Sequence, residues 1–194
     1  MTMLKGKKVA LRALEEAHLP VLAGWRSDGA SYPYFHEYQP ISLADQAAWF
    51  AAQRTNGHEM NFAVTTLDGG LVGTISLVNI DERNRRAELG RVFIGEERLR
   101  RGGFGREMTF LVLEYAFDHL NLHKVHCEVI ADNAPARGLY RKFGFNEEGV
   151  LRQHVFKSGR YLDVVLLGLF AQDYRDSPGE HVMACRAELN AITG

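Results

Sequence analysis

The sequence Glu97-Arg98-Leu99-Arg100-Arg101-Gly102-Gly103-Phe104-Gly105-Arg106 joins a segment of strand-like alternation to a segment of helical periodicity. Its glycines allow backbone N–H groups to approach a ligand closely. A helix that begins here presents unpaired N–H groups at its positive end, where anions bind. Arginine side chains add partners for phosphate oxygens, and the segment carries Arg98, Arg100, Arg101 and Arg106. The pattern predicts a phosphate-binding loop, and a plain strand–helix turn with a solvated basic rim is the alternative.

Segments with strand-like and helix-like patterns lie on both sides of this loop. We predict strands at 8–14, 60–66, 71–81, 86–94, 124–130, 146–157 and 160–170. We predict helices at 15–26, 42–55, directly after the loop, and at 133–144. Ser42 with Asp45 resembles a capping box, and Asn133 can cap the last of these helices. The mixture predicts a single α/β domain over 1–175, followed by a tail or short helix over 176–194.

The strand predicted at 86–94 leads directly into the loop. Period-two alternation places Ala87, Leu89, Arg91 and Phe93 on one face, and Glu88, Gly90, Val92 and Ile94 on the other. A carboxylate in the middle of a strand is costly if it is simply buried. We therefore expect Glu88 either to line a pocket or to form a salt bridge with Arg85 or Arg86.

Composition excludes several classes of function. The chain has 194 residues and a formal net charge of −1, so bulk attraction to nucleic acid or anionic lipid is not expected. No apolar run approaches the roughly 20 residues of a membrane span, and no secretory signal is recognisable. The two cysteines, Cys127 and Cys185, have no metal-ligand or disulfide spacing. We expect a cytoplasmic protein without a bound metal, with no nucleic-acid or membrane partner.

Two motifs in order carry a family resemblance. Arg100-x-x-Gly103-x-Gly105 resembles the pyrophosphate loop of the GNAT superfamily of acetyl-CoA-dependent N-acetyltransferases. Asn133-x-x-Ala136-x-x-x-Tyr140-x-Lys142-x-Gly144-Phe145 resembles the second motif of that superfamily, and the similarity extends over about residues 8–170. Ala87-Glu88-Leu89-Gly90 and Tyr161-Leu162-Asp163 resemble the branch that contains ribosomal-protein alanine and spermidine acetyltransferases.

The resemblance implies a fold and a cofactor site. The fold is a mostly antiparallel sheet of about seven strands with four to five helices, splayed between the strands at 86–94 and 124–130. Acetyl-CoA is expected in that opening, with its pantetheine on the backbone of Val92, Phe93 and Ile94. Its pyrophosphate is expected on the N–H groups of the loop, at Arg101, Gly102, Gly103, Phe104, Gly105 and Arg106. The side chains of Arg98, Arg100, Arg106 and Arg137 are expected near the phosphates, Asn133 is expected at the cofactor arm, and Tyr140 completes the cofactor-binding set.

The implied reaction is direct attack of a neutral amine on the thioester, which requires a proton acceptor and a proton donor. Tyr140 is the predicted general acid, because a phenol is a donor at neutral pH and the motif places it beside the sulfur. The alternative is that Tyr140 is a core aromatic. Glu88 is the predicted base or ammonium-binding group, and His36 and His126 are rivals.

The acceptor is expected between the early helices and the last strands. The candidate residues there are Tyr32, Tyr34, Phe35, His36, Glu37, Glu88, Tyr161 and Asp163. Aromatic side chains suit stacking on a sugar or a peptide, and the loop has few carboxylates for a polyamine. We therefore expect a small-molecule amine (an amino sugar, a polyamine or similar) and favour the amino sugar. Alternatives are an N-terminal acetyltransferase acting on a ribosomal or other protein, and a non-catalytic acetyl-CoA-binding regulator. A homo-oligomer is compatible with the sequence.

Overall fold

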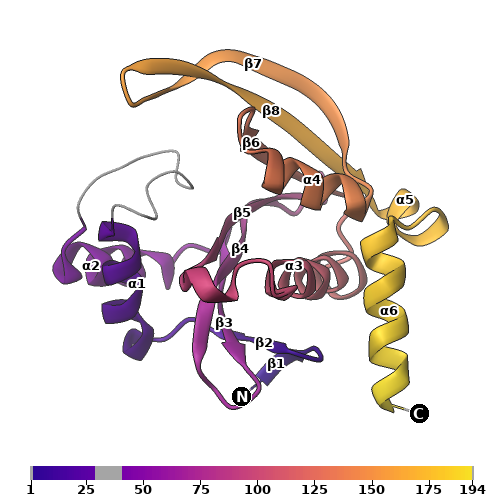
Figure 1. Cartoon of the computed structure of the whole chain (residues 1–194), viewed down its shortest axis with the longest axis horizontal. Coiled ribbons are helices and arrows are strands. Elements are labelled where there is room, and N and C mark those ends of the chain that lie inside the picture. The colour runs from indigo at the N-terminus through magenta and orange to yellow at the C-terminus, as the bar shows by residue number, and fades with distance from the viewer. Residues whose placement is uncertain (1, 29–40, 194) are drawn as a thin grey trace.

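The computed structural model describes residues 2–28 and 41–193. Its central element is an eight-stranded sheet in the order β1-β2-β3-β4-β5-β6-β8-β7 (Figure 1). The strands are β1 (Thr2–Lys5), β2 (Val9–Ala13), β3 (Met60–Thr66), β4 (Leu71–Asp81), β5 (Arg86–Ile94), β6 (Lys124–Ile130), β7 (Asn146–Lys157) and β8 (Arg160–Phe170). Every neighbouring pair is antiparallel except β5 and β6, which are parallel. The predicted mostly antiparallel α/β fold is confirmed, with β1 as a strand that the sequence patterns did not reveal.

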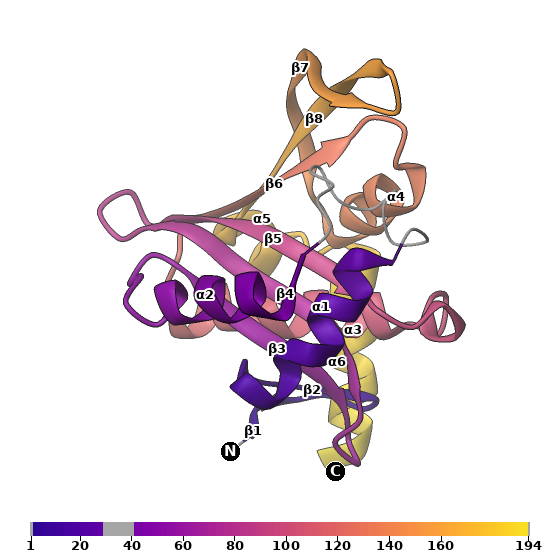
Figure 2. The same cartoon turned by 90° about the vertical axis from the view of Figure 1, so that its left-hand side faces the viewer.

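Helices cover both faces of the sheet. They are α1 (Leu19–Ser27), α2 (Leu43–Gln53), α3 (Phe104–Glu114), α4 (Ala134–Phe143), α5 (Ala171–Asp176) and α6 (Glu180–Thr193), with short turns η1 (Glu16–His18), η3 (Glu97–Leu99) and η4 (Tyr115–His119). Figure 2 shows α1 and α2 in front of the sheet, and α3 and α6 behind it. None of the helices within the described ranges combines the length and apolar character needed to cross a membrane.

Local sequence signals explain several helix ends. Ser42 and Asp45 form the predicted capping box at α2, where the Asp45 N–H donates to Ser42 Oγ at 3.1 Å. Asn133 caps α4, because its Oδ1 accepts the N–H of Ala136 at 3.2 Å. Gly144 ends α4 with a φ of 97°, a conformation that favours glycine.

The core lies between the sheet and the helices behind it. Met108 and Val112 of α3, Phe143 of α4 and Tyr174 of α5 are all buried in it. The segment expected as a tail or short helix contains α6, whose Val182 and Cys185 are buried in the same core. The division into a domain over 1–175 and a tail over 176–194 stays a prediction.

β5 departs from simple alternation. Ser76 of β4 pairs with Gly90 and Thr74 pairs with Phe93, so β5 contains an extra residue between these pairs. Arg91 lies in this β-bulge with a φ of 51°. The extra residue reverses which side chains point to each face beyond Gly90.

The predicted faces of this strand are therefore wrong beyond the bulge. Ala87 and Leu89 face the α3 side as expected, but Val92 and Ile94 pack on that side too. Phe93 instead contacts Trp25 of α1 on the other side, with ring centroids 6.1 Å apart. The side chain of Arg91 also points toward that side, because its guanidinium lies over the ring of Trp49 in α2 at 5.4 Å.

β5 and β6 separate just before the bulge, after Glu88. They pair only from Arg86 to Glu88 and from Lys124 to His126, although β5 continues to Ile94 and β6 to Ile130. Parallel strands that part in this way leave backbone N–H and C=O groups facing an opening. The predicted splay lies between these two strands.

Candidate functional site

The opening between β5 and β6 forms a cleft of about 260 Å³. Its lining comes from three elements. β5 contributes Glu88, Leu89, Gly90, Arg91 and Val92, β6 contributes Glu128, Val129 and Ile130, and α4 contributes Asn133, Ala136 and Tyr140. The splay therefore brings together the two predicted catalytic residues, Glu88 and Tyr140, from elements that are far apart in the sequence.

Tyr140 lies in α4 with only 5% of its surface exposed, and it contacts both the core and the cleft. Its ring packs against Phe145 with centroids 5.4 Å apart. Burial, and to a lesser extent the thiol of Cys127, raises the pKa of Tyr140 well above its usual value near 10. The phenol therefore keeps its proton at neutral pH and can act as a donor in the cleft.

Glu88 is half-buried, and it is the last residue of β5 that pairs with β6. Its Oε2 accepts a hydrogen bond from Nδ2 of Asn79 at 2.8 Å. The expected alternative, a salt bridge to Arg85 or Arg86, is not present within the described chain. Arg85 donates to the carbonyl of Asn121 at 2.8 Å, and Arg86 pairs with Asp81 at 3.4 Å. The carboxylate of Glu88 is therefore oriented by a neutral amide and not by an arginine.

β6 adds two groups to this region. Glu128 lines the cleft as a second carboxylate, a role that the sequence analysis did not predict. His126 is the pairing partner of Glu88 in the parallel section. Burial is the main influence on His126 and lowers its pKa, while the negative charge of Glu88 raises it. His126 is therefore neutral at neutral pH.

The glycine–arginine loop leads from η3 into α3. Gly103 precedes α3 with a φ of 84°, and no side chain caps this end. A Cβ atom on Gly102 would lie 2.9 Å from the ring of Phe104, so the loop is tightly folded. The first N–H groups of α3 are open to an anion, as the motif predicts.

The predicted phosphate-binding arginines are held by other groups. Arg98 pairs with Glu96 at 2.5 Å, and Arg106 pairs with Glu188 of α6 at 2.6 Å. Arg137 pairs with Glu147 at 2.7 Å, and Nε of Arg100 donates to the carbonyl of Ile94 at 3.3 Å.

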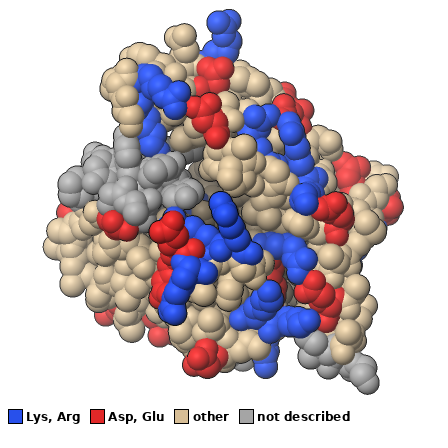
Figure 3. Space-filling model, in the orientation of Figure 1, with Lys and Arg blue, Asp and Glu red and all other residues tan. Residues whose placement is uncertain are grey.

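Two of these arginines also have unused hydrogen-bonding capacity. Nε of Arg106 and Nε of Arg137 are buried without a partner. In the orientation of Figure 1, basic side chains gather around the region that contains α3 and α4 (Figure 3). This is a positive field of the kind that a multiply charged ligand needs.

The expected acceptor residues give a mixed result. Tyr32, Tyr34, Phe35, His36 and Glu37 lie outside the described residues. Tyr161 is 64% exposed on β8 and packs on Phe156. Oδ1 of Asp163 accepts the N–H of Gln153 at 2.7 Å, which supports an irregular section of β7. Neither Tyr161 nor Asp163 is among the lining residues of the cleft.

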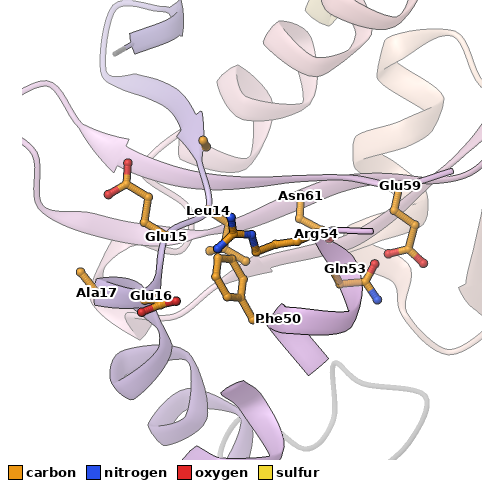
Figure 4. Close-up of a pocket in the computed structure, with 10 residues that line it drawn as sticks. Leu14, Glu15, Glu16, Ala17, Phe50, Gln53, Arg54, Glu59 and Asn61 are labelled. Carbon is orange, nitrogen blue, oxygen red and sulfur yellow. The ribbon is translucent and has the colours of Figure 1, made fainter. Parts of the chain in front are cut away.

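A second hollow, of about 550 Å³, lies between the β2–η1 connection and the end of α2. Figure 4 shows Arg54 extended above the ring of Phe50, with Glu15 and Glu16 on one side and Glu59 on the other. This hollow contains no residue of either motif. The two predicted catalytic residues, Tyr140 and Glu88, lie instead at the smaller cleft.

Three comparisons with known proteins show what this chain is similar to. A family model described as an acetyltransferase (GNAT) domain matches residues 8–146. The spermidine N(1)-acetyltransferase of Vibrio cholerae is 30% identical over 167 residues, covering 86% of this chain and 95% of that protein. The spermidine N(1)-acetyltransferase of Escherichia coli is 27% identical over 189 residues, covering 96% of this chain and all of that protein.

This chain is also similar to a solved structure. The crystal structure of spermidine N-acetyltransferase from Vibrio cholerae in complex with CoA and spermine has a TM-score of 0.80 to this chain. It is 30% identical and covers 86% of this chain and 97% of its own.

Proposed function

This chain belongs to the GNAT family of acetyltransferases and is an acetyl-CoA-dependent N-acetyltransferase; from that premise we propose that its acceptor is a primary amine of a polyamine. The single observation that carries the proposal is the convergence of Tyr140, Glu88 and Glu128 on the cleft where β5 and β6 part. We propose that the amine attacks the thioester directly, within a ternary complex.

The residues of the cofactor region fit acetyl-CoA. The uncapped start of α3 offers N–H groups to the pyrophosphate. The unpartnered Nε groups of Arg106 and Arg137 are further donors on either side. Beyond Glu88, β5 no longer pairs with β6, and the edge of β5 that faces the opening, along Val92, Phe93 and Ile94, is suited to the amides of the pantetheine arm. We assign these groups as the cofactor site.

Two protons move in the proposed reaction. The acceptor reaches the cleft as an ammonium ion and must lose one proton before it attacks. We assign Glu88 to bind this ammonium and to receive the proton, directly or through water. Carbon–nitrogen bond formation is coupled to cleavage of the carbon–sulfur bond, and the phenol of Tyr140 donates its proton to the departing sulfur. The second proton that the nitrogen loses as the amide forms returns to the phenolate of Tyr140, directly or through water.

The acceptor class follows from charge. Glu88 and Glu128 place two carboxylates in the cleft, while the nearby His126 is neutral. Such a site favours a substrate with more than one ammonium group. The named relatives are spermidine acetyltransferases. These observations support the polyamine over the amino sugar that the aromatic residues favoured.

The proposal is tested with an acceptor panel. The purified protein is mixed with acetyl-CoA and, separately, spermidine, spermine, glucosamine or a short peptide with a free N-terminus, and CoA release is followed with a thiol reagent. We expect kcat/KM to be highest for a polyamine. Preference for the peptide would support the protein N-terminal acetyltransferase, and tight CoA binding with no turnover would support the regulator; either result would reject the polyamine assignment.

A further inference from the structure

The turn between β1 and β2 lies against the start of α3. Glu107, in the first turn of α3, is only 5% exposed. Its Oε1 accepts the backbone N–H of Lys8 at 2.7 Å and that of Val9 at 3.3 Å. A Cβ atom on Gly6 would overlap this carboxylate, so the turn requires glycine at that position. These contacts fix residues that are 99 positions apart in the sequence.

The hydrogen bonds to Glu107 place the side chain of Lys8 at the phosphate loop. Nζ of Lys8 donates to the carbonyl oxygen of Gly102 at 2.8 Å. It also lies 3.3 Å from the position that a Cβ atom on Gly103 would occupy. The ammonium group of Lys8 therefore lies beside Gly103, the residue that precedes α3.

The location concentrates positive charge. The start of a helix carries a partial positive charge, which repels a cation. Arg100 and Arg101 add positive charge within the same short segment, in which Arg98 and Arg106 are paired with Glu96 and Glu188. An ammonium group has three donors, and the carbonyl of Gly102 uses one of them. The remaining donors can bind the oxygens of a phosphate that enters the loop.

We propose that Lys8 is a binding residue for the phosphate groups of acetyl-CoA, and that Glu107 positions it. This proposal rests on the assigned cofactor. It adds the β1–β2 turn to the loop before α3 as a second element of the phosphate site. The ligand chemistry is a phosphate or pyrophosphate oxygen, since neither Lys8 nor Glu107 lines the cleft where the acetyl group reacts.

The first test compares Lys8→Met with Lys7→Met, a neighbouring exposed lysine in the same turn. Binding of CoA is measured by calorimetry at low and high salt. We expect the Kd to rise about tenfold for Lys8→Met at low salt, with less difference at high salt. Lys7→Met is expected to bind like the unsubstituted protein, and Lys8→Arg to restore most of the affinity.

Kinetics then separate phosphate binding from a structural role. We expect Lys8→Met to raise the KM for acetyl-CoA with kcat unchanged. With S-acetylpantetheine, which has no phosphate, both proteins are expected to give equal kcat/KM. Equal CoA affinity for Lys8→Met and the unsubstituted protein would overturn the proposal. An equal loss with S-acetylpantetheine would also overturn it, because the lysine would then act only on the fold.

The positioning role of Glu107 has its own test. Glu107→Ala removes the acceptor of both backbone N–H groups. It is expected to weaken CoA binding in the unsubstituted protein and to have little further effect in the Lys8→Met protein, because Glu107 acts through Lys8. Fully additive effects of the two substitutions would contradict this coupling. CoA binding is measured without an acceptor, so failure here is distinguishable from failure of the polyamine assignment.

Discussion

Tyr140 has two properties that a proton donor to a departing sulfur needs. It lines the cleft, and its burial keeps the phenol protonated. The sequence motif identified this residue and offered a core aromatic as the alternative. The structure shows that Tyr140 belongs to the core and to the cleft wall together. Packing and proton donation are therefore compatible roles for this side chain.

Replacing Tyr140 by Phe removes the proton donor and keeps the ring. We expect kcat to fall roughly 10²–10³-fold with the affinity for CoA unchanged. The control is Tyr115→Phe, because Tyr115 stacks on His119 outside the cleft. Steady-state kinetics and CoA calorimetry make the measurement. A decrease of less than threefold in kcat for Tyr140→Phe would remove its assigned role.

The pH dependence follows from the same burial. Donation by Tyr140 needs the protonated phenol, and its raised pKa keeps that form present up to and beyond pH 10. Attack needs the neutral amine, which is favoured as the pH rises. We expect kcat to rise from pH 6 to about pH 9 without a fall on the alkaline side. An alkaline decrease centred near pH 10 or below would show that the donor has an ordinary or lowered pKa.

Glu88 is assigned to the acceptor and not to the cofactor. We expect Glu88→Gln to lower kcat/KM for spermidine about tenfold to a hundredfold while the Kd for CoA is unchanged. Glu82→Gln, an exposed residue in the β4–β5 turn, is the matched control. Initial rates at varied spermidine concentration measure kcat/KM for each variant. An equal effect of both substitutions would indicate a general change in surface charge.

Contacts between distant residues could not be predicted from the sequence. Glu107 with Lys8 and Arg106 with Glu188 join segments that have no shared motif. Their residue types are common on exposed surfaces, where ion pairs have no preferred partner. Only the fold brings these groups together. The sequence signals that succeeded, such as Asn133 and Gly144, act within one turn of the backbone.

At the scale of elements, β5 shows where local patterns fail. Alternation identified the bounds of β5, and it predicted the faces correctly as far as Gly90. The bulge at Arg91 has a positive φ in a residue other than glycine, which no local signal predicts. The section of β5 whose faces were wrongly predicted is the section that has separated from β6 and borders the cleft.

The cap of α4 gives a test at this scale. Asn133→Ala removes the acceptor for the N–H of Ala136. We expect the free energy of unfolding to fall by about 1 kcal/mol, and Asn133→Asp, which can still cap, to retain most of it. Urea denaturation measures both. Equal stability of the Ala and Asp variants would show that the cap contributes nothing to stability.

At the scale of the whole molecule, the net charge of −1 hides a local separation of charge. Arginines near the cofactor site are held by carboxylates from remote elements, as Arg106 is by Glu188 and Arg137 is by Glu147. Composition alone therefore excluded bulk binding to polyanions without identifying the ligand. The two motifs identified the family, and the family model and relatives confirm it.

The buried thiol of Cys127 favours direct transfer over an acetylated enzyme. Cys127 is 1% exposed, and burial raises its pKa, so the thiol stays protonated. A protonated thiol is a poor nucleophile. This observation supports the proposed direct attack of the amine, in which both substrates are bound together.

The most direct test varies acetyl-CoA and spermidine together in initial-rate measurements, with the acetylated product identified by mass spectrometry. Direct transfer in a ternary complex predicts double-reciprocal lines that intersect, and one CoA released for each acetylated amine. Parallel lines would indicate an acetylated enzyme, and the absence of product with every amine would show that this cleft does not catalyse acetyl transfer.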